Sequence, residues 1–380
     1  MSSGEACELA DDNDNLRILL VALNSSFGGV ERHLVDLSPE LAKRGHEVTL
    51  VAPRRSVLAA TARTFPDVKV IELSGSPMKA LSLRRLYKNL CPDIVHLHSP
   101  RASVTGRAAA KLLSGTERHG ITVISTAHGW ISVRLRLRLV YEWIYNKTAT
   151  WEDGIIAVSE AVRETLEDNQ YPNRIYVVPN GISPDWTRGL VASCDPGERP
   201  LRLGYFGRLE GEKGFSVLVE ALKRVRSDRW QLSVYGDGRD RNKYEKSVRL
   251  AGLDRQVRFA RAIPADDVPG SMANCHAVVL PSLQEGCPYV VLEALSLGVP
   301  IVGSAVGGVP DLVRDGKDGL LISPGQPDSL AHAIRRLIKD PELLSVLRQN
   351  ALARQDDFTS RQMTDRLVSV YRSAVAEHQL

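Results

Sequence analysis

Short apolar runs alternate along the chain with longer amphipathic stretches. This alternation is typical of repeated βαβ units, in which helices join parallel strands. In the first half it predicts strands at residues 16–23, 47–51, 68–73, 93–98, 122–127, 154–158 and 175–179. A helical period in the segments between them predicts helices at residues 30–44, 103–113 and 161–168.

The pattern is interrupted once and then restarts. Residues 183–200 are rich in proline and glycine and show little periodicity, which predicts an interdomain linker. Beyond it we expect strands at residues 201–206, 230–235, 257–259, 277–280, 301–303 and 319–322. Helices are expected at residues 215–225, 290–297, 327–339 and 341–354, followed by a last helix at 360–377.

The two halves predict an α/β protein with two Rossmann-like, doubly wound domains that face each other across a cleft. The first would span residues 16–190, and the last segment, 360–380, would return to it. The second would span residues 198–358. Ligands of such folds bind at the carboxyl ends of the strands, so candidate residues are sought there.

Composition narrows the class of protein. With 380 residues and 43% hydrophobic content, the chain can bury two sizeable cores. Its 49 basic and 45 acidic residues give a net charge of only +4, which argues against a nucleic-acid partner.

Localisation follows from what the sequence lacks. Residues 1–15 carry five acidic and no basic residues, so we interpret them as a loose acidic tail rather than a secretory signal. No apolar run reaches the roughly 18–20 residues of a membrane span. The five cysteines have neither CxxC pairs nor metal-ligand spacing, and one must stay unpaired, which favours a reducing cytoplasm.

The loop after residues 201–206 carries the first chemical signal. Arg208 and Lys213 lie five residues apart and are accompanied by Gly207, Gly211 and Gly214. Two cations in a loop whose glycines allow close backbone approach suit a diphosphate. The alternative is an ordinary exposed, charged loop.

Two carboxylates follow the strand at residues 277–280. Glu285 lies in the loop and Glu293 near the start of the next helix, so both side chains can point to one place. The amides of Gly286 and Cys287 would lie at the helix N-terminus, which attracts negative charge, and Pro288 suits the first helical turn. Two solvated glutamates beside a core helix are the alternative.

The first domain offers weaker candidates at its own sheet edge. Gly28 and Gly29 open the first helix without matching the dinucleotide fingerprint, and His128 closes a strand. His96 and His98 alternate on the strand before Arg101, so one could face the ligand while both remain possible packing residues. We predict no metal site, because no carboxylate or cysteine follows at ligand spacing.

The remaining signals are turns and basic stretches. Asn180, Gly236 and Gly307 lie in glycine turns at carboxyl ends of predicted strands. Basic residues mix with apolar ones at 81–90 and 133–145, as in helices that contact membrane surfaces, although most such helices are merely half-buried.

Taken in order, these motifs resemble the retaining glycosyltransferases of the GT-B fold, family-4 type. The resemblance rests on the glycine turns, His128, the basic loop and the glutamates above, together with Val158-Ser159, and covers nearly the whole chain after the tail. It departs from the family in two places: residues 285–288 read Glu-Gly-Cys-Pro where many relatives have Glu-Gly-Phe-Gly, and Ser183 stands where many have aspartate.

The resemblance implies a role for each matching residue. Arg208 and Lys213 would neutralise the donor diphosphate, Glu285 would contact the donor sugar, and Glu293 would bind the ribose. His128 would lie beside the reacting centre. The further donor contacts would be Gly28, Gly29, Gly207, Gly236, Gly286, Cys287 and Pro288. Independently of the resemblance, the position of His96, His98 and Arg101 at the end of a strand makes them our expected acceptor contacts.

The expected function is therefore transfer of a sugar from a nucleotide-diphosphate sugar, with retention and without metal or cofactor. The acceptor would be a glycan or lipid-linked sugar in surface polysaccharide, lipopolysaccharide or glycolipid biosynthesis, on the cytoplasmic face of the membrane. The alternatives are a nucleotide-sugar epimerase or hydrolase of the same fold and a non-catalytic nucleotide-sugar binding protein. An NAD-dependent oxidoreductase is disfavoured by the missing fingerprint.

Overall fold

The computed structural model describes residues 15–24, 28–74, 79–113, 120–129, 135–260 and 263–378, with the backbone alone for 135–141. The predicted acidic tail lies almost entirely outside these ranges. The chain divides into two compact units, one comprising Met1–Gly181 with Ser360–Leu380 and the other Ile182–Thr359.

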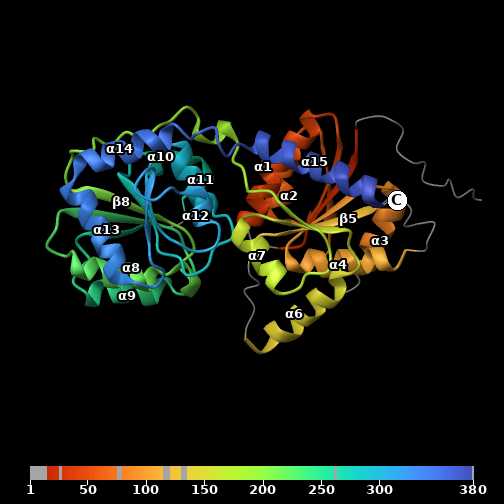
Figure 1. The fold of residues 1–380 in the computed structure, drawn as a ribbon, viewed down its shortest axis with the longest axis horizontal. Coiled ribbons are helices and arrows are strands. Elements are labelled where there is room, and N and C mark those ends of the chain that lie inside the picture. Colours follow the sequence, from red (N-terminus) through yellow and green to blue (C-terminus); the bar gives the residue numbers. More distant parts are fainter. Residues whose placement is uncertain are drawn as a thin grey trace, which may run out of the picture. The chain divides into compact units, whose positions relative to one another are not determined.

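The first unit is built on a seven-stranded parallel sheet in the order β3-β2-β1-β4-β5-β6-β7 (Figure 1). Its strands are β1 (Arg17–Ala22), β2 (Glu47–Pro53), β3 (Val68–Leu73), β4 (Ile94–His98), β5 (Thr122–Ala127), β6 (Gly154–Ala157) and β7 (Ile175–Val177). Its helices are α1 (Gly29–Lys43), α2 (Val57–Ala62), α3 (Lys79–Leu90), α4 (Pro100–Lys111), α6 (Leu135–Ala149), α7 (Glu160–Asp168) and α15 (Ser360–His378).

Both faces of this sheet are apolar, which explains its continuous hydrophobic strands. Along β1, Ile18 and Leu20 pack in the core that α1 and α15 cover. Leu19 and Val21, which point the opposite way, pack in the core under α3 and α4. The sequence of a strand buried on both faces therefore shows an unbroken apolar run rather than an alternation.

The second unit repeats the architecture with a six-stranded parallel sheet in the order β10-β9-β8-β11-β12-β13 (Figure 1). Its strands are β8 (Leu201–Phe206), β9 (Trp230–Tyr235), β10 (Val257–Ala260), β11 (Ala277–Leu280), β12 (Ile301–Ser304) and β13 (Gly319–Ile322). Its α-helices are α8 (Phe215–Arg224), α9 (Arg241–Leu250), α10 (Val268–Ala273), α11 (Tyr289–Ser296), α12 (Val309–Leu312), α13 (Pro327–Lys339) and α14 (Pro341–Leu352). Short 3₁₀ turns cover Pro184–Thr187, Gly211–Lys213 and Ala265–Asp267. The two doubly wound α/β sheets confirm the predicted fold class.

The division between the units lies earlier in the chain than the sequence suggested. Residues 182–193, predicted to belong mostly to the first domain, pack on the second unit. The Ile182 amide donates to the Phe358 carbonyl (2.9 Å), and the Ala192 amide donates to the Leu297 carbonyl (2.7 Å). Low periodicity at 183–200 therefore marks a segment that lies along the second unit, and the chain passes back to the first unit at Ser360.

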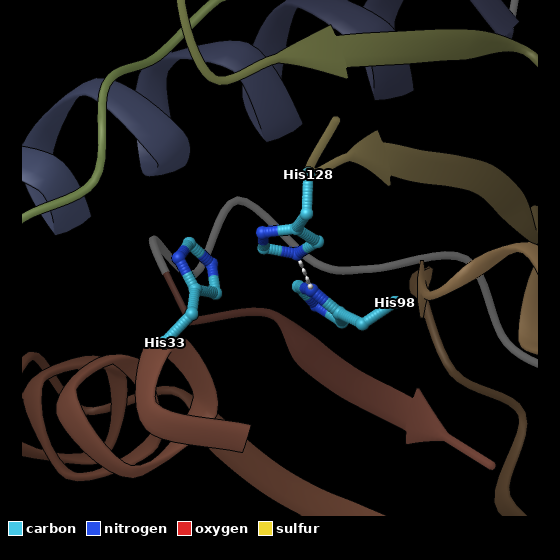
Figure 2. A group of neighbouring side chains, drawn as sticks. All are labelled: His33, His98 and His128. Carbon is cyan, nitrogen blue, oxygen red and sulfur yellow. Dashed lines mark hydrogen bonds between the residues drawn. The ribbon is translucent and has the colours of Figure 1, made fainter. Parts of the chain in front are cut away.

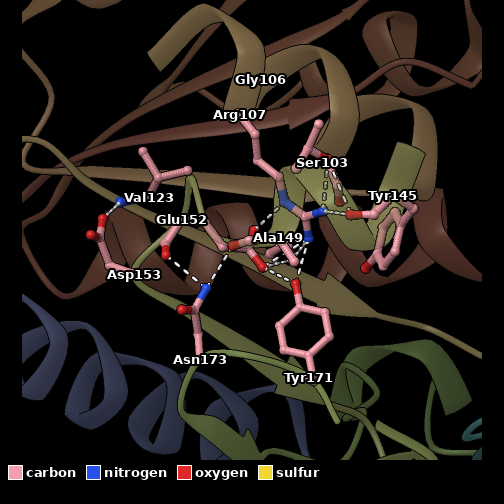
Figure 3. A network of polar contacts seen from close by, with 12 residues as sticks. Ser103, Gly106, Arg107, Val123, Tyr145, Ala149, Glu152, Asp153, Tyr171 and Asn173 are labelled. Carbon is pink, nitrogen blue, oxygen red and sulfur yellow. Dashed lines mark hydrogen bonds and ion pairs between the residues drawn. The ribbon is translucent and has the colours of Figure 1, made fainter. Parts of the chain in front are cut away.

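A buried ion pair in the first unit joins α4 to the segment between α6 and β6 (Figure 3). Arg107 on α4 binds Glu152 in two hydrogen bonds of 2.7 and 2.8 Å, and both side chains are fully buried. The Arg107 guanidinium also donates to the Tyr145 carbonyl (2.9 Å), while Ser125 and Tyr171 donate to Glu152. Burial opposes the charge on Arg107, but Glu152 raises the pKa of the Arg107 guanidinium above its ordinary value.

One further property bears on the expected membrane contact. Among the described residues, no helix combines the length and the apolar character needed to cross a bilayer. The second basic stretch falls on α6, where the side chains of residues 135–141 lie outside the description. Trp143, later on α6, is 62% exposed.

Candidate active site

Four loops at the carboxyl ends of β8, β9, β11 and β12 meet in the second unit. Three glycines allow this close packing, because a Cβ atom at Gly214, Gly236 or Gly307 would lie within about 2 Å of a carbonyl oxygen of a neighbouring loop. These oxygens belong to Pro281, Gly207 and Glu285, respectively. All three glycines have positive φ angles, which favour glycine further.

An ion pair lies within this group of loops. Lys213 Nζ binds Glu285 Oε1 at 2.8 Å, and the Ser282 hydroxyl donates to the same oxygen at 2.6 Å. The Glu285 side chain is only 7% exposed, whereas that of Lys213 is 22% exposed. The structure thus brings together the lysine and the carboxylate that the sequence placed in separate motifs, and Ser282 is a partner that the sequence did not reveal.

Arg208 differs from the expectation of a second fixed cation beside Lys213. Its side chain is 58% exposed and pairs with Glu210 (2.6 Å) and Glu212 (3.3 Å) in its own loop. These two glutamates lie between Arg208 and Lys213 in the chain, and the sequence did not reveal their pairing with Arg208. A ligand diphosphate would therefore compete with two carboxylates for the Arg208 guanidinium.

The other donor candidates surround the start of α11. Gly286, Cys287 and Pro288 are buried, and Pro288 is the N-cap residue of the helix rather than part of its first turn. Glu293 is the fifth residue of α11 and is half-buried. The Gly308 amide donates to the Gly286 carbonyl (2.7 Å), so the β12–α12 loop supports the segment that carries Glu285.

In the first unit, Gly28 and Gly29 open α1 as expected. The Gly28 amide donates to the Glu31 carboxylate at 2.9 Å, which closes the first turn. Glu31 is buried, and burial raises its pKa. Arg101, an expected acceptor contact, is exposed in the first turn of α4.

The histidines of the first unit divide into two kinds. His96 and His98 lie on the same face of β4, as residues two apart must, with ring centroids 3.9 Å apart. His96 is fully buried, and its nitrogens bond to the hydroxyls of Tyr371 and Thr126, both at 2.6 Å. Both nitrogens of His96 are engaged within the unit, so neither is left to contact an acceptor substrate. His96 therefore has a packing role, contrary to the expected contact with the acceptor substrate.

His98, in contrast, faces the end of the sheet together with His128. His98 Nδ1 lies 3.3 Å from His128 Nε2, and His33 from α1 completes the group (Figure 2). Sequence reasoning did not single out His33. A histidine in an amphipathic helix does not stand out in the sequence as a site residue, and only the tertiary fold brings His33 to residues 98 and 128.

Replacing Gly214 by alanine should destabilise the second unit. Gly214 has φ +65°, and a Cβ atom there would lie 1.9 Å from the Pro281 carbonyl oxygen, so the β8–α8 and β11–α11 loops must separate. We expect a loss of about 1–3 kcal/mol in the free energy of unfolding, measured by urea denaturation. Gly211→Ala in the same loop is the matched control, because no atom lies within 4 Å of its Cβ position. Equal stability of the two variants would contradict the packing described.

Comparison with known proteins agrees with this geometry. The second unit matches the family model for glycosyl transferases group 1 over residues 195–354, and the first matches that for glycosyltransferase family 4 over residues 27–186. Glycogen synthase of Mycobacterium tuberculosis is 27% identical, covering 94% of this chain and 95% of the relative. The UDP-Gal:alpha-D-GlcNAc-diphosphoundecaprenol alpha-1,3-galactosyltransferase of Escherichia coli is 27% identical, covering 89% and 92%.

Solved structures show the same fold. Anabaena HepE in complex with UDP-glucose superposes with a TM-score of 0.81 at 20% identity, covering 94% of this chain and all of that one. The two family models together cover most of the chain, one in each unit, and the chain therefore belongs to the family-4 type of glycosyltransferases, with the two-domain α/β GT-B fold.

Proposed function

We propose that this glycosyltransferase moves a sugar, with retention, from a nucleotide-diphosphate sugar to a glycan or lipid-linked acceptor in surface polysaccharide or glycolipid biosynthesis. The observation that carries the proposal is the Lys213–Glu285 pair, held among four packed loops of the unit that matches the group 1 family model. A cation and a carboxylate fixed side by side suit a ligand that presents both a diphosphate and sugar hydroxyls.

The donor would be bound by charge and by backbone. Lys213 would neutralise the diphosphate, with Arg208 joining it after leaving Glu210 and Glu212. Glu285 would accept hydrogen bonds from the sugar hydroxyls and Glu293 from the ribose. Amides at Gly286 and Cys287 precede α11, where the partial positive charge of a helix N-terminus favours negative ligand atoms.

Uridine is the proposed base. The E. coli relative is named for UDP-Gal, and the HepE structure contains UDP-glucose. The same relative is named for a diphosphoundecaprenol-linked sugar, which supports a lipid-linked acceptor at the cytoplasmic face of the membrane. Exposed Trp143 on α6 supports such a membrane contact, because an exposed indole suits the interface between water and lipid.

The reaction would need no metal ion for the leaving group. The developing charge on the departing diphosphate can be stabilised by the Lys213 ammonium, the Arg208 guanidinium and helix-terminal amides. His128 would lie beside the reacting sugar, and the acceptor hydroxyl would attack from the face that the diphosphate leaves, which retains the anomeric configuration. The glutamates would bind the donor rather than form a covalent intermediate, unlike the carboxylate pair of retaining hydrolases.

A donor screen tests the proposal. We expect UDP-sugars, and not GDP- or ADP-sugars, to raise the melting temperature of the wild type, and Lys213→Ala to abolish this rise. The responding donor is then incubated with lipid extracts or soluble glycans, and the anomeric configuration of the product is determined by NMR.

The possible outcomes separate the competing functions. Donor consumption without an acceptor would favour the epimerase or hydrolase, and binding without turnover would favour a binding protein. An inverted product would refute retention. Absence of a shift with every nucleotide sugar would refute the donor site itself.

A further inference from the structure

Three histidines from distant parts of the sequence meet in the first unit. His33 lies on α1, His98 ends β4 and His128 follows β5, and their rings turn toward a common point (Figure 2). One nitrogen of each ring lies within 4.8 Å of the corresponding nitrogens of the other two. His33 and His98 are almost completely buried, with 2% and 0% exposure.

The hydrogen bonds of these rings leave a buried nitrogen without a partner in the described part of the chain. His33 Nδ1 lies 3.0 Å from the Asn180 amide oxygen. That oxygen can only accept, so Nδ1 donates and Nε2 of the neutral ring carries the lone pair. Among the residues that the structure describes, His33 Nε2 has no hydrogen-bond partner, so it is the nitrogen free to bind an ion. His98 faces His128 with its Nδ1 instead. Buried polar atoms without partners are rare, and each calls for a reason such as a bound ion.

The arrangement has the features of a metal-binding group. Histidine ligands typically donate their second nitrogen to an oxygen acceptor, as His33 does to Asn180. Zinc–nitrogen bonds of about 2.0–2.1 Å in a tetrahedron separate the ligand nitrogens by about 3.3 Å. The measured distance between His98 Nδ1 and His128 Nε2 is 3.3 Å.

The three rings come from separate elements of the fold, which are α1, the end of β4 and the segment after β5. The absence of a carboxylate or cysteine at ligand spacing, which argued against a metal in the sequence, loses its force because the third imidazole comes from α1.

We propose that His33, His98 and His128 bind one zinc ion, with a fourth coordination position open to water. Three imidazoles suit zinc and similar transition metals, whereas magnesium and calcium prefer oxygen ligands. If the function proposed above holds, zinc on His128 removes that side chain from the substrate, and zinc inhibits transfer while EDTA leaves it intact.

Zinc binding is measured directly, without donor or acceptor, so the result does not depend on the transferase activity. The full chain is treated with EDTA, exchanged into chelator-free buffer and titrated with zinc chloride by calorimetry. We expect one zinc per chain. Separate His33→Ala and His98→Ala variants should each bind zinc at least about tenfold more weakly. Removing a residue that only hydrogen-bonds to a metal ligand already weakens metal binding by this factor, and these variants remove a ligand itself.

His332→Ala is the matched control, because His332 is exposed on α13 in the other unit. Equal zinc affinity in the wild type and both site variants, or no binding at all, would overturn the proposal. Should the variants not fold, as circular dichroism would show, the visible spectrum of the cobalt-substituted wild type decides. Intense tetrahedral d–d bands support the site, and the weak bands of octahedral cobalt refute it.

Discussion

Lys213→Ala should lower kcat/KM for sugar transfer by about 100- to 1000-fold while the protein stays folded. This is the usual effect of removing one fixed group that stabilises charge developing in the transition state. Lys213 contacts Glu285 at 2.8 Å, and its side chain remains 22% exposed, so its ammonium can also reach a ligand. Steady-state kinetics with the donor found in the screen, together with a thermal melt, measure both parts of the expectation.

Lys223→Ala is the matched control for this variant. Lys223 lies on α8, in the same unit, and pairs with Glu220 at 3.0 Å, but half of each side chain is exposed. Its removal should change transfer less than twofold, since an exposed pair of this kind contributes little. Near-normal turnover in Lys213→Ala, or an equal loss in Lys223→Ala, would remove Lys213 from the site.

The Glu285→Gln variant tests whether the charge of Glu285, the partner of Lys213, is needed for transfer. The amide keeps the shape of the side chain and can still accept from Ser282 and Lys213, but it lacks the charge. A loss in transfer similar to that of Lys213→Ala would show that the carboxylate itself is required for the reaction. Because Glu285 is nearly buried, Glu285→Ala would in addition leave a cavity and confuse binding with stability.

The sequence predicted the sheets well because their central strands, such as β4 and β11, are buried on both faces. An apolar run such as residues 277–280 has no other simple interpretation in a chain with βαβ spacing. The convergence of Lys213 and Glu285 was also predictable, because both follow carboxyl ends of strands in the same parallel sheet, and β8 and β11 are neighbours.

Helices with few buried residues were harder to predict. The residues of α9 show no clear helical period, since Tyr244 and Val248 are its only buried side chains among ten residues. The short α10 has Pro269 and Gly270 as its second and third residues, so its composition resembles a turn. In both cases tertiary contacts, not local preference, determine the helix.

Side-chain pairings between distant elements could not be predicted from spacing. His33 meets His98 and His128 because α1 packs on the sheet beside the end of β4, and Arg208 pairs with the acids of its own loop. Arg107 lies in the alanine-rich part of α4, where an arginine would normally be taken as solvent-exposed. Its partner Glu152 is 45 residues away.

Arg107→Met should cost the first unit about 3–5 kcal/mol of unfolding free energy, because it leaves the Glu152 carboxylate buried without its cation. Ser125 and Tyr171 would remain as donors to Glu152, but neither carries charge. Urea denaturation followed by circular dichroism measures the change. Two units need not unfold together, so the transition of each unit is fitted separately.

Arg163→Ala is the matched surface control, since Arg163 pairs with Glu160 and Glu167 on the exposed side of α7. It should cost less than about 1 kcal/mol. The double variant Arg107→Met with Glu152→Met distinguishes an unpaired charge from lost packing. If the penalty of the single variant comes from the orphaned carboxylate, removing that carboxylate as well should restore part of the stability. A double variant less stable than either single one would instead show that the ion pair and its hydrogen bonds to α6 and β5 stabilise the unit through their geometry.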